Sequence, residues 1–174
     1  MKHPFKSISI LVVLFLIIAG NSAAQSFTIE LDVEPRVETT VNRSLDFGQI
    51  VAGTGFQQIP LGSPTMGVFQ IRTLNAQNLI ISLDPSSELV HQELGRMASI
   101  PLNLQVNYTQ NGVDDYRQSV PLTGFERYIT LDPPPQNPQS AWTSVFLYVY
   151  GSIELGMVPS GVYTGEVVLS VVYE

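Results

Sequence analysis

The chain has 174 residues, of which 44% are hydrophobic, and this apolar content is enough for a core, which excludes a disordered chain. It contains no cysteine, which excludes a disulfide scaffold, a cysteine-ligated zinc site and a cysteine nucleophile. With 8 Lys+Arg against 15 Asp+Glu, the formal net charge of −7 argues against nucleic acid and anionic membrane surfaces as partners.

Residues 1–24 have the layout of a secretory signal peptide. Two lysines lie within the first six residues, an almost continuously apolar run covers residues 8–19, and small side chains precede a cleavage point after Ala24. The apolar run is shorter than the roughly 20 residues that a membrane-spanning helix needs, although the pattern leaves an uncleaved anchor open as the alternative. We therefore expect an exported protein whose mature chain begins at Gln25 and has no membrane span.

The first residues of the mature chain alternate between apolar and polar side chains. The apolar positions are Phe27, Ile29, Leu31 and Val33. This period of two predicts a half-buried β-strand, which Pro35 ends. We therefore treat residues 25–35 as an N-terminal extension and residues 36–174 as one domain.

The remainder of the chain has the pattern of an all-β fold. Alternating or apolar segments predict strands over residues 37–47, 68–74, 79–83, 102–108, 116–122, 142–153 and 162–173. The segment 142–153 is apolar on both faces, which predicts a central strand. Between these segments we expect a loop or short edge strand over 51–64, a turn over 84–87 and an exposed, proline-rich loop over 132–138. Short strands separated by frequent turns predict a β-sandwich.

The sequence offers little for catalysis. His91 is the one histidine that remains after signal cleavage, and its polar neighbours over residues 86–95 predict a solvated loop residue rather than a ligand or a base. The chain contains no Gly-x-Ser-x-Gly elbow, phosphate loop or His-x-x-x-His pair. Asp114 and Asp115 lack the oxygen-rich spacing of a calcium loop. We therefore predict a protein that is not an enzyme, with no catalytic, cofactor-binding or metal-binding residue and no cofactor.

The C-terminal segment carries a more specific pattern. Five apolar or aromatic residues at odd-numbered positions would lie on one side of a strand: Tyr163, Val167, Leu169, Val171 and Tyr173. Tyr173 is the penultimate residue, and Gly161 is the fourteenth from the end. This pattern resembles the C-terminal signature of chaperone–usher pilus subunits. The resemblance implies that a periplasmic chaperone pairs a strand with this segment and that an outer-membrane usher takes part in assembly.

A second resemblance covers most of the mature chain. Residues 45–54 begin with Leu-Asp-Phe-Gly, and residues 161–165 read Gly-Val-Tyr-Thr-Gly before the alternating valines. These motifs look like the opening and the ending of a family of secreted bacterial domains that is similar to spore coat protein U and related fimbrial subunits. The resemblance implies an immunoglobulin-like β-sandwich without enzyme activity. The chain departs from many pilus subunits in lacking their cysteines.

The pilus resemblance also implies how such a domain assembles. A sandwich that lacks its last strand is completed by the extension of the next subunit through β-strand addition, here by the donor-strand residues Phe27, Ile29, Leu31 and Val33. The C-terminal assembly strand would comprise Gly161, Tyr163, Val167, Leu169, Val171 and Tyr173. Copies or related subunits would then join head to tail, in the periplasm in transit and afterwards at the cell surface or in an extracellular fibre.

Two other interpretations share these patterns. The extension has the same alternation if it is an ordinary first strand of its own domain, which would make the sandwich self-complete. Such a domain would be a secreted binding module for a sugar or a surface protein, with Trp142, Tyr148 and Tyr150 as a stacking platform. The aromatic-rich segment that holds these residues nevertheless favours a place in the core.

Overall fold

A computed structural model describes residues 37–75, 78–131 and 140–173. This part of the chain contains strands and two short 3-10 helices but no α-helix, which confirms the all-β prediction. It also contains no helix that is long and apolar enough to cross a membrane. The elements are β1 (Glu38–Arg43), β2 (Gly55–Ile59), β3 (Gly67–Leu74), β4 (Asn78–Pro85), β5 (Glu88–His91), β6 (Gly95–Thr109), η1 (Tyr116–Gln118), β7 (Val120–Pro121), η2 (Thr123–Phe125), β8 (Glu126–Thr130), β9 (Trp142–Leu155), β10 (Tyr163–Thr164) and β11 (Val167–Tyr173).

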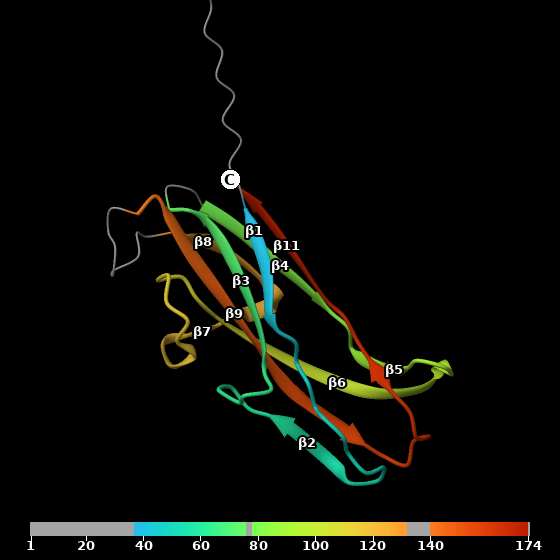
Figure 1. Cartoon of the computed structure of the whole chain (residues 1–174). Helices are drawn as coiled ribbons and strands as arrows, with labels where there is room; N and C mark the ends of the chain where they lie inside the picture. The colour runs from blue at the N-terminus through green and yellow to red at the C-terminus, as the bar shows by residue number, and fades with distance from the viewer. Residues whose placement is uncertain (1–36, 76–77, 132–139, 174) are drawn as a thin grey trace, which may run out of the picture. The chain divides into compact units, whose positions relative to one another are not determined.

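The strands form two antiparallel sheets that face each other as an immunoglobulin-like sandwich, as predicted (Figure 1). The larger sheet has the order β1-β3-β9-β6-β5-β10, with β2 also paired to β9 and β7 to β6. The smaller sheet has the order β11-β4-β8. Strands β1 and β11 are therefore edge strands of different sheets, and this arrangement positions the candidate site.

The core explains why the segment 142–153 is apolar on both faces. On the inner face of β9, Val145 and Leu147 are fully buried between the sheets, together with Leu79 and Ile81 of β4. On its outer face, Tyr148 is also fully buried, in a second cluster with Ile59, Met66, Val68 and Phe146. The prediction of a central strand is thus confirmed, since β9 lies between β3 and β6.

Two chain segments cross from one sheet to the other, which the sequence did not predict. The turn predicted over 84–87 is limited to residues 86–87, because β4 continues to Pro85 and the chain then enters β5 in the larger sheet. The predicted strand 162–173 is likewise divided into β10 in the larger sheet and β11 in the smaller one. The crossings are bonded together: the Ser86 N–H donates to the Glu166 carbonyl at 2.8 Å, and the Glu166 N–H donates to Ser86 Oγ at 3.0 Å.

Other predicted segments differ in extent. The edge strand expected within 51–64 is present as β2, whereas the strand expected over 37–47 ends at Arg43. The return strand predicted over 116–122 is wrong except for β7, because Asp115 caps a 3-10 helix there by accepting a bond from the Arg117 N–H at 3.0 Å. The extension 25–35, with all four donor-strand residues, and the loop 132–138 lie outside the described residues.

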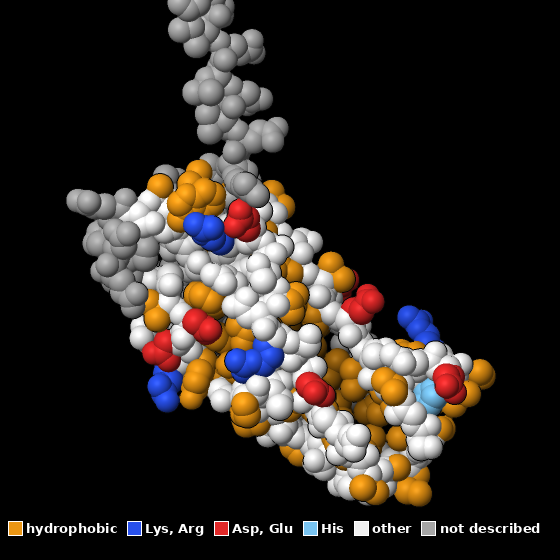
Figure 2. Space-filling view, viewed as in Figure 1, with side chains coloured by type: hydrophobic (Ala, Val, Ile, Leu, Met, Phe, Trp, Pro, Cys, Tyr) orange, Lys and Arg blue, Asp and Glu red, His pale blue; other side chains and the backbone are white. Residues whose placement is uncertain are grey.

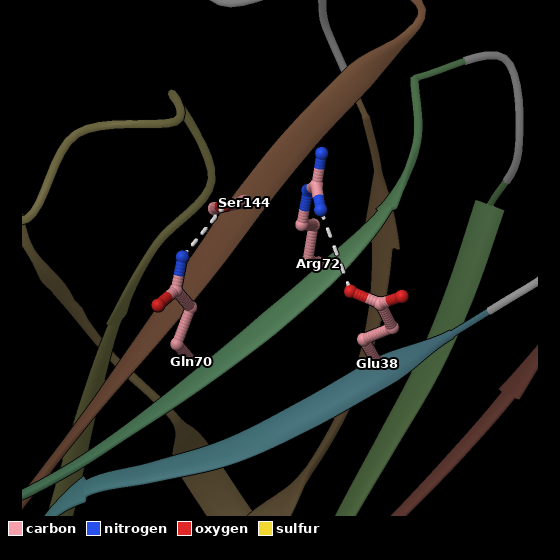
Figure 3. A network of polar contacts seen from close by, with 4 residues as sticks. All are labelled: Glu38, Gln70, Arg72 and Ser144. Carbon is pink, nitrogen blue, oxygen red and sulfur yellow. Dashed lines mark hydrogen bonds and ion pairs between the residues drawn. The ribbon is translucent and has the colours of Figure 1, made fainter.

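Polar contacts on the outer face of the larger sheet join its edge strand β1 to β3, and β3 to β9 (Figure 3). Arg72 of β3 forms an ion pair with Glu38 of β1 at 3.5 Å, and the Gln70 amide donates to Ser144 Oγ of β9 at 3.2 Å. The exposed ion pair adds at most about 1 kcal/mol. Backbone hydrogen bonds with β3 also hold β1 in place, so β1 forms a fixed edge of the candidate site.

Candidate binding groove

A groove of about 830 Å³ opens between β1 with the chain that follows it and the segment that leads into β11. Figure 2 shows it as a hollow with hydrophobic side chains at its bottom. The floor is the inner face of the larger sheet, formed by Ile100, Leu102, Leu104, Val149, Ile153 and Leu155. One wall consists of residues 43–52 and the other of residues 158–167. Such an apolar trough is suited to an extended apolar segment rather than to a charged ligand.

The groove exists because the two sheets differ in length. Strands β6 and β9 have 15 and 14 residues, whereas β4 and β11 in the smaller sheet have 8 and 7. At Gly165 the chain passes between the sheets, and a Cβ there would lie only 3.0 Å from Leu89 Cδ2. Beyond this crossing the smaller sheet no longer covers the long strands, so their inner faces line the groove.

The edges of the groove bear apolar residues that point inward yet stay open. Val41 of β1 pairs with Phe69, which packs against the core, so both side chains lie on the inner side of the sheet. Val41 is nevertheless 56% exposed. On β11 the inward row is half-buried and packs against the core, comprising Val167, Leu169, Val171 and Tyr173. Among the described residues, no strand pairs with the outer edge of β1 or of β11.

One groove wall is held by His91, whose predicted exposure is wrong. The side chain is only 4% exposed, because the stretch 86–95 forms the β5–β6 hairpin rather than a solvated loop. Imidazole Nδ1 accepts the N–H groups of Glu93 and Leu94 at 3.1 and 3.2 Å, and Nε2 lies 3.2 Å from the carbonyl oxygen of Ser160. Buried polar groups are normally bonded in this way, and the sequence around His91 gave no sign of it.

The predicted assembly residues at the C-terminus lie in two places. Val167, Leu169, Val171 and Tyr173 share one face of β11, as expected, whereas Tyr163 lies on β10 in the other sheet. The Tyr173 hydroxyl accepts a bond from Thr73 Oγ1 at 3.1 Å and so joins the two sheets beside β1. Gly161 packs against the His91 ring, where any side chain would collide with Nε2. Of this segment, residues 161–167 line the groove, whereas Leu169, Val171 and Tyr173 pack against the core.

The aromatic residues considered as a sugar platform are not arranged as one. Tyr148 is fully buried, and its hydroxyl donates to Asp114 at 2.8 Å. Burial raises the pKa of the Tyr148 phenol far above its ordinary value, and the Asp114 carboxylate raises it further. The Tyr150 hydroxyl donates to Asn107 Oδ1 at 2.9 Å, and the Arg72 guanidinium lies over the Trp142 ring at 4.9 Å. The three rings therefore take part in separate packing contacts.

The acidic hairpin tip has structural contacts of its own. Both carboxylate oxygens of Asp115 accept hydrogen bonds, from the Gln118 amide at 2.9 Å and from the Arg117 N–H at 3.0 Å. These two bonds, with that of Gln118 the larger influence, lower the pKa of the Asp115 carboxyl. Within the described ranges, no three His, Cys, Asp or Glu side chains are grouped so that they could hold a metal ion.

The apolar groove between two free strand edges is therefore the prominent candidate site in the described part of the chain. Its geometry suits the addition of a β-strand, because both edges present unpaired backbone groups and inward apolar side chains. A comparison with models of known protein families and with characterised proteins finds no match to this chain.

Proposed function

We propose that this protein is a non-enzymatic, exported structural subunit of a surface fibre or pilus, and that its groove takes the extension 25–34 of another copy. The observation that carries this proposal is that no strand of the described residues lies between the free edges of β1 and β11. Val41 points inward but is 56% exposed, and the free edge of β11 lies beside a groove with an apolar floor. An added strand would cover both features at once.

The extension and β11 have matching patterns. The extension has four apolar residues at alternate positions, and β11 has four inward residues at the same spacing. Since adjacent strands present side chains to the same face at equal intervals, the apolar row of the extension can pack beside the inward row of β11, of which Val167 also lines the groove. Burial of four large apolar side chains stabilises the complex by roughly 6–12 kcal/mol as an upper estimate. The acidic residues between them would face solvent.

Donation of the extension from one copy to the next determines the symmetry of the assembly. The contact is heterologous, since the groove of one subunit meets the extension of another, and repetition of such a contact produces an open filament. Before assembly the same groove would expose apolar surface, and we expect a periplasmic chaperone to cover it and an outer-membrane usher to receive the subunit. The subunit would pass through the periplasm and end at the cell surface.

Deletion of residues 25–34 from the mature chain tests this proposal. We expect the shortened protein to remain folded but monomeric in size-exclusion chromatography, because its own groove is unchanged while it has no strand to donate. A synthetic peptide with the sequence of residues 25–34 should bind it with a stoichiometry of one. If the shortened chain instead unfolds, and the mature chain runs as a monomer at every concentration, the extension completes its own domain and the fibre proposal is wrong.

A further inference from the structure

The wall that contains residues 158–163 is attached to the rest of the sandwich through His91. The Gln92 N–H donates to the Val162 carbonyl at 2.9 Å, and the Tyr163 hydroxyl donates to the Pro159 carbonyl at 2.8 Å. The His91 and Tyr163 rings meet edge to face, with centroids 4.9 Å apart and an angle of 82° between their planes. Ser160, Val162 and Tyr163 all line the groove, so these contacts, together with the β10–β5 ladder, set the position of this wall.

The hydrogen bonds of His91 require one protonation state. Nδ1 accepts two backbone N–H groups, so it carries no proton in this arrangement. The single proton of the neutral ring therefore lies on Nε2, which donates to the Ser160 carbonyl. An imidazolium would place an N–H at Nδ1 against the two N–H donors of Glu93 and Leu94. The hairpin turn would then have to release at least one of these contacts.

Groups from β10, from the wall and from the hairpin contact the ring. The contacting side chain from β10 is the Tyr163 ring, which meets the imidazole edge to face. From the wall, Ser160 contributes its carbonyl, and Gly161 has no side chain. On the hairpin, Glu93 contributes its N–H, while Glu88 pairs with Arg96 at 3.8 Å. The three hydrogen bonds of the imidazole thus fit its neutral form.

We infer that His91 is a positioning residue, which in its neutral form holds the 158–163 wall against the β5–β6 hairpin and on protonation releases it. Acidification would loosen the wall, because a proton added to Nδ1 removes the acceptor of two backbone N–H groups. The consequence for assembly rests on the proposed function: a loosened wall should weaken strand binding in the groove. Assembly would therefore be favoured in neutral surroundings and reversed in acidic ones.

Amide hydrogen exchange of the mature chain, followed by NMR at pH 7.5 and pH 5, tests this inference. After correction for the intrinsic rates, protection of the Gln92, Glu93 and Leu94 amides should fall about tenfold or more at pH 5, as expected when one or two hydrogen bonds are lost. The matched variant is His91→Asn, whose carbonyl oxygen replaces Nδ1 as an acceptor but does not titrate. Its protection factors should be lower at pH 7.5, because the Ser160 bond is lost, and should not change with pH.

The same samples separate this inference from the proposed function. Equal protection of these amides at both pH values in the natural chain would overturn the role of His91, whatever the state of assembly. An identical pH dependence in His91→Asn would also overturn it. If protection falls at pH 5 but size-exclusion chromatography shows a monomer at both pH values, the wall behaves as inferred and the fibre proposal fails. If His91→Asn does not fold, the pH profile of the natural chain alone decides.

Discussion

Replacement of Gly151 by alanine is expected to destabilise the sandwich by more than about 3 kcal/mol, which would prevent stable folding of a marginal domain. Gly151 lies in β9 and pairs with Ile59 on one side and Leu104 on the other. A Cβ at this position would overlap the backbone carbonyl oxygen of Asn103 and lie 3.0 Å from the Leu104 Cα. Because these are backbone atoms of an adjacent strand, no side-chain rotation can relieve the overlap.

Gly156→Ala is the matched control for this substitution. Gly156 follows β9 directly, and a Cβ there would meet no atom within 4 Å. Its urea unfolding midpoint should therefore stay close to that of the natural protein, whereas Gly151→Ala should have a much lower midpoint or give only insoluble protein. Equal midpoints for the two variants would show that β6 and β9 do not approach each other as described.

Leu31→Asp in the mature chain is expected to abolish assembly while the domain itself remains folded. Leu31 lies near the middle of the apolar row of the extension, and in the proposed complex its side chain enters the groove. Transfer of an unpaired carboxylate into an apolar groove costs several kcal/mol, and each 1.4 kcal/mol weakens binding about tenfold. Sedimentation over a range of concentrations should show oligomers for the natural chain and a monomer for the variant.

Thr28→Asp provides the control, because this residue belongs to the outward row of the same strand. It introduces the same carboxylate but leaves it in solvent, so assembly should be nearly unchanged. If the two variants assemble equally well, the alternation of the extension does not determine binding. If both prevent assembly, added negative charge rather than groove burial is responsible, and the proposed packing is wrong.

The sequence predicted the features that depend on local pattern. The run from Trp142 to Ile153 is apolar on both faces, and such a segment needs cover on both sides, so its central position followed directly. The alternation from Val167 to Tyr173 placed four residues on one face of the last strand. In both cases the periodicity of side chains along one strand contains the necessary information.

The features that the sequence did not reveal depend on contacts between distant segments. Neither the turn residues over 84–87 nor the alternation through Gly165 says to which sheet the next strand belongs, so the two crossings were missed. His91 was misjudged because its neighbours in sequence are polar, whereas its burial arises from Ser160 and Tyr163 far along the chain. The groove itself results from the unequal lengths of two sheets, which no single segment encodes.

The absence of cysteine in the natural sequence permits a direct test of strand donation. One chain would carry Leu31→Cys and a second chain Leu169→Cys, so that a disulfide between different molecules forms only if the extension of one lies beside β11 of the other. Inward residues on adjacent strands have Cβ atoms about 4.5–5.5 Å apart, close to disulfide geometry. Ile29→Cys in place of Leu31→Cys tests pairing in the neighbouring register. Glu126→Cys on β8, at the other edge of the smaller sheet, is the control position.

A chain that carries both Leu31→Cys and Leu169→Cys gives the decisive measurement, by non-reducing electrophoresis after mild oxidation at several concentrations. Donation between subunits predicts a ladder of covalent oligomers, and a mixture of the two single variants should give a dimer that Glu126→Cys does not form with Leu31→Cys. A monomer that contains an internal disulfide at every concentration, with no dimer from the mixture, would show that each extension fills its own groove and would contradict the fibre proposal.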